Sequence, residues 1–285
     1  MDKIVFIDDG HKYLYKYNSL LSGTTFIKKY NPPFDSEKMS TISAVKKIIG
    51  EDLYKRLRKE IFAFNFKPDI EDVLDIFIPI CGGKDNLAEV KKSILEEWDD
   101  SGPKGTSFHK DRENEFIEAG FAVNPFTGNS LPIITFDKSF DNEVYSMNLM
   151  DCPDGFYTEF LVFHNGIDPS RTICGTIDML WIESDGENRF TYTDDWKTNS
   201  SEPSDSKFEK MLPPIQDLFS NKHNDYILQG SLYQSMLMSH GFTPKQSAYT
   251  WVKNYDKNQL TRKPFKFMFD KIELLLKDYN NVNVC

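Results

Sequence analysis

Three β-rich runs stand close together in the second half of the sequence, and they constrain the fold more than any other feature. They are FYTEFLVFH (156–164), TICGTIDMLWIE (172–183) and RFTYTDDWKT (189–198). The second and third are separated by SDGEN, a polar, glycine-containing turn that is typical of a β-hairpin. Strands this close in sequence usually pair in space. The sequence therefore predicts that all three share one sheet.

The segments after these runs predict the rest of an α/β core. A helical pattern (225–241), a further strand (246–255) and a final helix (265–279) follow in order. A polar, proline-containing stretch (199–224) precedes them. It is too long for a plain connector, so we expect it to be either functional or mobile.

The chain begins with a different pattern. Residues 3–17, KIVFIDDGHKYLYKY, contain two alternating runs around the turn-forming trio DDG (8–10), which predicts a β-hairpin. Residues 35–100 are mostly helical in pattern, and a capping-box pattern starts at Ser36.

An interruption near residue 100 suggests a domain boundary. DNLAEVKKSILEEWDD (85–100) has the periodicity of an amphipathic helix, and SGPKGT (101–106) is expected to break the chain before a new helix over 107–120. We therefore expect an N-terminal hairpin and helical lobe over 1–100 and a core with the C-terminal helix over 101–285.

The charge balance excludes a surface coated in basic residues. The chain has 44 acidic and 34 basic residues and a formal net charge of −10. This balance still allows local basic strips that face a phosphate backbone. Two lysine-rich segments, residues 46–60 and 253–267, are candidates for such strips. Each strip is equally typical of a solvated helix or loop face. No apolar run approaches the roughly 20 residues that span a bilayer. With no signal-peptide pattern, we expect a soluble, cytoplasmic protein without a membrane partner.

The cysteines do not predict a metal cluster. The four are Cys81, Cys152, Cys174 and Cys285. No two are close enough in sequence to form a CxxC ligand pair, so neither a zinc finger nor an iron–sulfur cluster is indicated. Free thiols in a reducing compartment are the simplest expectation.

Two acidic residues and a lysine predict the candidate site. In a tight hairpin, Asp178 and Asp195 would lie side by side on neighbouring strands, and Lys197 would follow on the same face as Asp195. Two such carboxylates repel each other unless a cation lies between them, and oxygen ligands favour Mg²⁺ or Mn²⁺. Phosphodiester hydrolysis suits this arrangement. Taken alone, D-x-K also fits a charged strand end. Asp194 alternates with Asp195 and is expected to point away from it, either to solvent or behind the site.

The surrounding motifs resemble the RecB-like exonuclease branch of the PD-(D/E)xK nuclease superfamily. The branch carries G-x-x-D on one strand and D-Y-K-T on the next, which GTID (175–178) and DWKT (195–198) match, with Trp196 in place of tyrosine. GTSFHKDRE, TEFLVF and QGSLY resemble its helix motif, its acidic first strand and its Q-x-x-x-Y motif. The matching motifs cover roughly residues 102–255. Within the branch, this sequence is most similar to phage exonucleases and the mitochondrial genome maintenance exonuclease. The cysteine clamp of the iron–sulfur members is missing.

The resemblance implies roles for individual residues. The implied metal ligands are His109, Asp178, Asp195, Glu159 and the backbone carbonyl of Trp196. The implied catalytic residues are Lys197, Asp178, Asp195, Glu113 and Glu159. The implied DNA contacts are Gln229, Tyr233 and Thr198. In this interpretation Lys197 orients and helps to deprotonate the attacking water and stabilises the pentavalent phosphate. The two glutamates support a second ion or a bound water.

Some of these residues also fit structural roles. His109 and Glu113 are four residues apart on a predicted helix, so a surface ion pair would explain them. Glu159 alternates with apolar neighbours and could face solvent. Gln229 and Tyr233 share a helical face, which fits a tyrosine packed against the sheet.

The expected protein is therefore a Mg²⁺- or Mn²⁺-dependent deoxyribonuclease with one or two ions. It has a restriction-endonuclease-like α/β core, with a mixed central sheet flanked by helices in the order α-β-β-β-α-β, and an N-terminal, mostly helical lobe. The expected activity is exonucleolytic cleavage of single-stranded DNA or DNA with free ends, in replication, recombination or repair. For a phage-encoded protein the compartment would be the host cytoplasm. The alternatives are a structure-specific endonuclease and a catalytically silent DNA-binding module.

Overall fold

The three predicted β-rich runs form neighbouring strands of one sheet. In the computed structural model, β7 (Gly155–His164) pairs antiparallel with β8 (Ile173–Ser184), which pairs antiparallel with β9 (Arg189–Lys197). The chain then crosses through α6 (Lys222–Met238) and returns as β10 (Thr243–Asn254), parallel to β9. The sheet is therefore mixed, and the predicted mixed α/β class is confirmed.

The described residues are 4–7, 12–15, 18–62, 70–135, 152–164, 171–207, 209–254 and 259–281. They form two compact units: residues 1–32 with 107–285, and residues 33–106. This division differs from the predicted domains 1–100 and 101–285, because the N-terminal segment joins the unit that holds the sheet. Two contacts explain the difference. β4 (Leu21–Ser22) pairs parallel with β8, and α1 (Gly23–Lys28) packs on α6.

An edge strand that the sequence analysis does not predict lies before the last helix. β11 (Gln259–Phe265) pairs antiparallel with β10, and α7 (Phe269–Asn281) begins only after it, four residues later than the predicted helix at 265. Pro264 lies in this strand. A proline lacks the N–H that a central strand would donate, so its presence suits an edge position.

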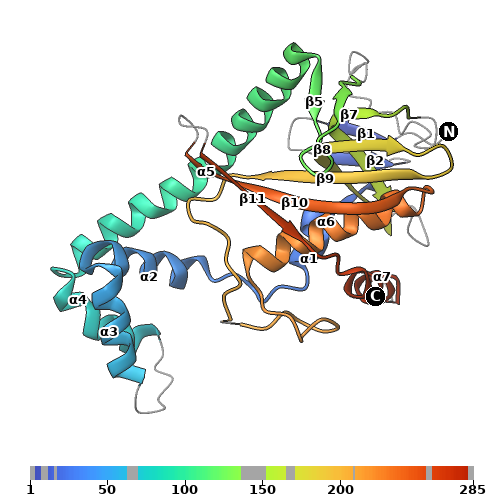
Figure 1. The fold of residues 1–285 in the computed structure, drawn as a ribbon. Helices are drawn as coiled ribbons and strands as arrows, with labels where there is room; N and C mark the ends of the chain where they lie inside the picture. Colours follow the sequence, from blue (N-terminus) through green and yellow to red (C-terminus); the bar gives the residue numbers. More distant parts are fainter. Residues whose placement is uncertain are drawn as a thin grey trace. The chain divides into compact units, whose positions relative to one another are not determined.

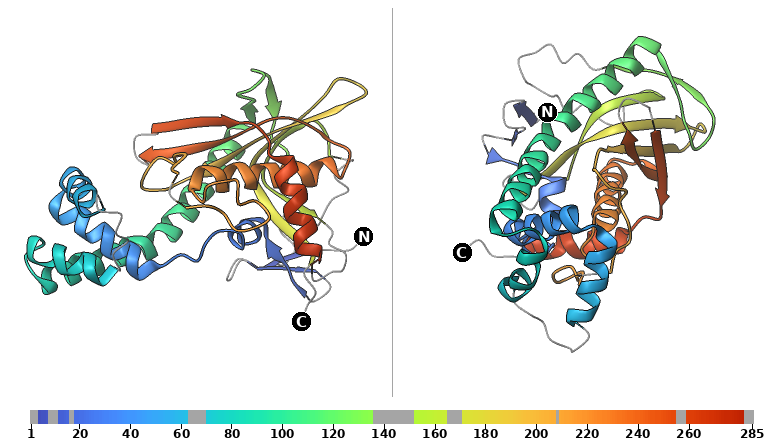
Figure 2. Two further views of the ribbon diagram at one scale, coloured as in Figure 1. Left: turned by 90° about the horizontal axis from the view of Figure 1, so that it is seen from below. Right: turned by 90° about the vertical axis from the view of Figure 1, so that its left-hand side faces the viewer.

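Helices flank both faces of the sheet (Figure 1). On one face, α1, α6 and α7 pack against β7 and β8 around Leu228, Leu232 and Leu275, and Figure 2 shows α6 and α7 on this side. On the other face, residues 107–119 of α5 (Lys84–Ala119) pack against the sheet through Phe108 and Phe116. The short hairpin of β5 (Phe121–Val123) and β6 (Ser130–Pro132) completes this face.

The predicted N-terminal hairpin is confirmed. β1 (Ile4–Ile7) and β2 (Lys12–Tyr15) pair antiparallel, and β3 (Asn18–Ser19) adds a third short strand. The predicted turn at 8–10 lies outside the described residues. Tyr13 and Leu20 pack with Leu161 and Cys174 of the sheet, so this segment contributes to the core.

The second unit is helical, as predicted. It contains α2 (Ser36–Ile49), α3 (Glu51–Phe62), α4 (Ile70–Ile80) and the first part of α5. Asp35 caps α2 in place of the predicted Ser36, and its carboxylate accepts the backbone N–H of Lys38. The apolar faces meet in a core cluster of Ala44, Val45, Tyr54, Phe77, Cys81, Leu87 and Ile94.

The predicted break at 101–106 is wrong, because α5 continues through it. Pro103 lies inside the helix although its ring removes one backbone hydrogen bond, a cost of about 3 kcal/mol. Nearby hydroxyl groups satisfy carbonyl oxygens around it: Ser101 donates to the Trp98 carbonyl at 2.7 Å and Thr106 to the Gly102 carbonyl at 3.2 Å. Helical periodicity on both sides of the proline outweighs the local break signal.

The polar segment between β9 and α6 is anchored to the core. Met211 and Ile215 are buried, and the Leu212 N–H donates to the Tyr30 carbonyl at 2.7 Å. The hydroxyl of Ser220 in this segment donates to the Asn31 side chain at 3.0 Å, and Asn31 in turn donates to Asp225 of α6 at 2.8 Å. The polar composition of this segment left mobility open as one of two expectations. Its few apolar residues, which composition alone does not single out, pack into the core.

Among the described residues, none of the helices combines the length and apolar character that a membrane span requires. Cys81, Cys152 and Cys174 lie buried in three different core clusters, and Cys285 is outside the described residues.

Candidate metal centre and D-x-K site

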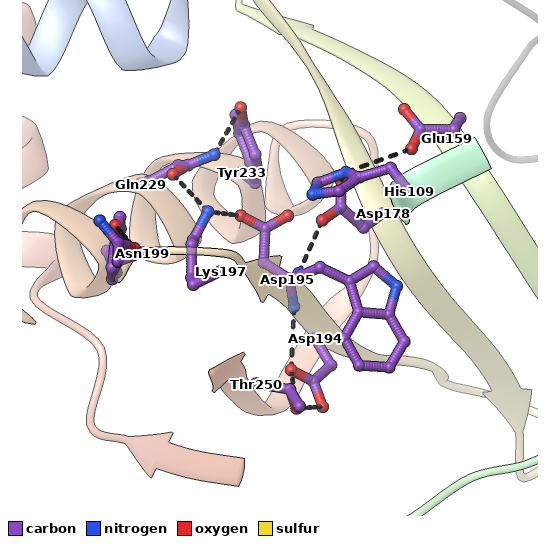
Figure 3. Close-up of polar contacts among 12 residues, drawn as sticks. His109, Glu159, Asp178, Asp194, Asp195, Lys197, Asn199, Gln229, Tyr233 and Thr250 are labelled. Atoms are coloured by element: carbon purple, nitrogen blue, oxygen red, sulfur yellow. Dashed lines mark hydrogen bonds and ion pairs between the residues drawn. The ribbon is translucent and has the colours of Figure 1, made fainter. Parts of the chain in front are cut away.

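Three acidic residues lie side by side on three neighbouring strands. The β7–β8 register places Glu159 opposite Asp178, and the β8–β9 register leads to Asp195 beside Asp178. Figure 3 shows the side chains of these three residues in one group with His109. Carboxylates at adjacent cross-strand positions are only about 5 Å apart at their Cβ atoms, so they repel one another unless a cation or a proton intervenes.

An irregularity in β7 and β8 directs two of these carboxylates to the site. Tyr157 and Phe160 join the same core cluster although they are three residues apart, and so do Ile177 and Leu180 on the opposing strand. A regular strand would place such residues on opposite faces. Glu159 lies at the break with φ 46°, and it is the one non-glycine residue with positive φ in the described part of the chain. This backbone costs about 1–3 kcal/mol and is typical of functional sites.

His109 of α5 completes a group that fits a cation. Its Nδ1 lies 3.5 Å from Asp178 Oδ1 and 3.9 Å from Glu159 Oε1. One ligand atom from each of the three residues falls within 4.8 Å of the others. A helix and two strands thus bring one imidazole and two carboxylates together, a donor set that can hold a divalent cation.

The electrostatics of this group favour a positive charge. Burial and the neighbouring charge of Asp195 raise the pKa of Asp178 to about 7, although His109 opposes the shift. Burial alone would lower the pKa of His109, but the charges and hydrogen bonds of Asp178 and Glu159 raise it to about 10. Asp178 and His109 therefore retain protons in the absence of metal, and a bound cation would displace these protons.

The carboxylate of Asp195 is turned toward Lys197. The Lys197 ammonium donates to Asp195 and, at 3.1 Å, to Gln229 Oε1 of α6, and it lies 4.6 Å from the centre of the Tyr226 ring. Burial would lower the pKa of Lys197, but the charges of Asp195 and Asp178 raise it. The lysine is thus a protonated, positioned donor beside the cluster.

Two glycines make room for the tyrosine behind this lysine. Gln229 Nε2 donates to the Tyr233 hydroxyl at 3.1 Å. A Cβ atom on Gly175 would lie 2.6 Å from the Tyr233 ring, and one on Gly23 would lie 2.9 Å from it. Real Cβ contacts are longer, so neither position accepts a larger residue without displacing the ring. Burial raises the pKa of Tyr233 well above its usual range, so this hydroxyl stays neutral.

The remaining predicted residues lie around the cluster. Glu113 accepts a hydrogen bond from the Thr158 hydroxyl at 3.2 Å and is not part of the three-residue group. The Trp196 N–H donates to Asp178 Oδ2 at 2.7 Å, and its side chain packs in the α5 face of the sheet. A strand residue directs its N–H and C=O to the same side, so the Trp196 carbonyl also points toward the cluster. Thr198 is half-buried directly after β9.

The sequence interpretation missed Tyr226 and Asn199. The Tyr226 hydroxyl donates to the Asn199 side chain, and the Asn199 carbonyl accepts the Trp251 indole N–H at 2.9 Å. The position of Tyr226, three residues before Gln229 on one helix face, was a usable signal. No local pattern marks Asn199, whose partners lie on other elements.

Comparisons with known proteins leave the family open. No family model matches the chain, and no curated protein matches it. Among the solved structures that match is one titled "Crystal structure of SSO0001", which is 13% identical with a TM-score of 0.24. The match covers 44% of this chain and 48% of that one, so it spans about half the length of that protein. A similarity this low carries no argument about fold or function.

Proposed function

We propose that this protein is a metal-dependent DNA exonuclease of the PD-(D/E)xK superfamily, related to its RecB-like branch. The element order α5, β7, β8, β9, α6, β10 supports a restriction-endonuclease-like core. The observation that carries the proposal is the meeting of Lys197 and Asp195 with the cluster of His109, Glu159 and Asp178. Fold alone would not identify an activity, but this set of groups supports metal-dependent phosphodiester hydrolysis.

The side chains present fit a divalent cation. Burial and the charges of carboxylates on adjacent strands raise the pKa of Asp178 to about 7, and a cation would relieve the repulsion between the carboxylates. The proposed ligands are His109, Asp178, Asp195, Glu159 and the backbone carbonyl of Trp196. Bound Mg²⁺ or Mn²⁺ would supply Lewis-acid activation of water and neutralise charge on the phosphate.

The residues of the chain divide the remaining tasks. Lys197 is held by Asp195 and Gln229, so its ammonium is placed to orient the attacking water and to donate to the pentavalent phosphate. Glu113, beside β7, supports Glu159 in holding a second ion or a water. The proposed DNA contacts are Gln229 and Thr198. Tyr233 is buried behind Lys197, so in place of the predicted DNA contact it positions Gln229.

A cleavage assay on matched DNA substrates tests this function. We expect end-labelled linear DNA to be degraded from its ends with Mg²⁺ or Mn²⁺, and EDTA to abolish the reaction. Asp195→Asn, which keeps the side-chain size, should remove the activity, whereas Glu187→Gln in the exposed β8–β9 turn should retain it.

The products separate the alternatives. Cleavage of closed circular DNA as fast as linear DNA would favour a structure-specific endonuclease. DNA binding without cleavage under any metal would favour a silent binding module. Undiminished cleavage in EDTA, or by Asp195→Asn, would refute the metal mechanism at this site.

A further inference from the structure

A buried carboxylate lies directly behind the D-x-K residues. Asp194 is fully buried on the face of β9 opposite Asp195, which selects the second of the two expected positions, behind the site and not in solvent. Both of its oxygens accept from the Thr250 hydroxyl, at 2.9 and 2.8 Å, and Oδ2 accepts from Arg262 Nε at 2.6 Å. The N–H of Asp195 donates to Asp194 Oδ1 at 2.9 Å. One carboxylate thus links β9 to Thr250 of β10, as Figure 3 shows, and through Arg262 to β11.

This link lies where the sheet gives β9 the least support. The pairing of β8 with β9 ends at Met179 and Asp194, whereas β10 continues beside β9 as far as Lys197. The segment 195–197, which carries the proposed catalytic groups, is therefore paired with β10 alone, apart from the bond from the Trp196 N–H to Asp178. A strand end that is hydrogen-bonded to one neighbouring strand moves more easily than one that is hydrogen-bonded to two.

Stability alone is a poor explanation for this ion pair. Burial raises the pKa of Asp194, with Arg262 and Thr250 opposing the shift, which reflects the cost of a charge in the interior. Replacement of a buried pair by apolar residues is often neutral or stabilising. The Arg262 side chain remains 40% exposed and lies 6.0 Å from the centre of the Phe126 ring, so its burial contributes little.

We propose that Asp194 and Arg262 are positioning residues that hold the end of β9, and with it Asp195 and Lys197, in the geometry that the reaction requires. Neither residue touches the substrate. Both act through the Asp195 backbone N–H and through the bridge to β10 and β11. This inference rests on the proposed nuclease function, but metal binding tests it separately.

The experiment compares five variants of the full chain. They are Arg262→Met, Arg262→Lys, Thr250→Val, the double variant Asp194→Asn/Arg262→Met, and the control Thr191→Val. Thr191 is also buried in β9 and donates to Gln234 at 2.7 Å, but it lies at the far end of the strand from the site. For each protein we measure the Tm, Mn²⁺ affinity by calorimetry, DNA affinity in Ca²⁺ and the single-turnover cleavage rate in Mg²⁺.

We expect Arg262→Met to lower the cleavage rate by about 10- to 100-fold and to weaken Mn²⁺ binding several-fold, because a misplacement of about 1 Å has effects of this size. DNA affinity should stay within about twofold. Thr250→Val should act in the same direction more weakly, and Arg262→Lys should recover part of the rate. Thr191→Val should lower the Tm comparably without changing rate or Mn²⁺ affinity.

The double variant separates positioning from stability. It removes the unpaired buried charge, so the Tm should recover relative to Arg262→Met while the rate stays low. Recovery of the rate along with the Tm would overturn the inference, as would an equal loss of rate in Thr191→Val. A fall in DNA affinity that accounts for the lost rate would make Arg262 a DNA contact instead. If the wild-type protein cleaves no DNA, the nuclease proposal fails, and Mn²⁺ affinity across the same variants still decides the positioning role.

Discussion

The buried carboxylate of Asp178 should make the metal-free protein less stable as the pH rises. In the folded protein its pKa is raised to about 7 by burial and by the charge of Asp195. In the unfolded chain an aspartate has a pKa of about 3.9. Between these values the folded state holds a proton that the unfolded state has released, so stability falls as the pH increases through this window.

The structure sets the size of the effect. From pH 5 to the folded-state pKa of about 7 the window spans two pH units, which corresponds to about 3 kcal/mol of unfolding free energy. His109 acts in the same direction. Its pKa is raised to about 10, so the stability that it contributes is complete below about 6.5 and is lost as the pH rises toward 10.

Urea denaturation of wild type and Asp178→Asn, in EDTA at pH 5 and pH 8, measures this difference. The wild type should lose at least about 3 kcal/mol more than the variant between the two conditions, because the His109 contribution adds to that of Asp178. In the variant, His109 also loses the largest charge that raises its pKa, so the remaining slope should be shallow. Glu187→Gln, in the exposed β8–β9 turn, is the matched control and should follow the wild type.

Added metal provides the second half of the test. At pH 8 a hundredfold excess of Mg²⁺ or Mn²⁺ over its Kd should stabilise the wild type by about 2.7 kcal/mol. Asp178→Asn should gain much less, because it has lost a ligand. If the unfolding free energies of wild type and Asp178→Asn depend on pH in the same way, the raised pKa does not belong to Asp178. Equal stabilisation of both proteins by metal would place the cation elsewhere.

Three further predictions follow from the same geometry. Lys197→Ala should lower the single-turnover cleavage rate by about 10²–10⁴-fold, and calorimetry should show an unchanged or slightly higher Mn²⁺ affinity. Lys197→Arg should not restore the rate. Cleavage by Lys197→Ala within a few-fold of wild type would contradict the D-x-K assignment. In urea denaturation, Gly175→Ala should lower the free energy of unfolding by about 1–3 kcal/mol, because its Cβ would meet the Tyr233 ring at 2.6 Å. The control Gly102→Ala, in open space within α5, should be neutral or stabilising. In a gel assay, linear single strands should disappear much faster than covalently closed single-stranded circles, and equal rates would contradict an exonuclease.

Local patterns in the sequence were sufficient for most elements of the sheet and for the arrangement of the D-x-K residues. Alternating apolar residues and a polar turn predicted β8 and β9 as a hairpin, and that hairpin places Asp178 beside Asp195. The spacing of Gln229 and Tyr233 predicted one helix face, which the structure directs toward Lys197. These predictions succeed because strand and helix periods depend on near neighbours, which the sequence itself supplies.

Where local signals competed with distant contacts, the tertiary structure decided. α5 continues through the break signal at Pro103 with core residues, Ile94 and Phe108, on either side of it, and a pairing with β10 made residues 259–265 a strand. The orientation of Glu159 depends on a backbone irregularity shared by two strands, which strict alternation cannot represent.

The environment of each candidate group also came from the fold alone. The sequence places Asp194 one residue from Asp195 but does not show that Thr250 and Arg262, 56 and 68 residues further along the chain, surround it. The cluster of His109 with Glu159 and Asp178 likewise joins α5 to two strands. Residue type and spacing determine which chemistry a segment can support. Burial, charge and hydrogen-bond partners depend on packing between distant segments, and these decide whether a carboxylate is a solvated charge, a strand anchor or a metal ligand.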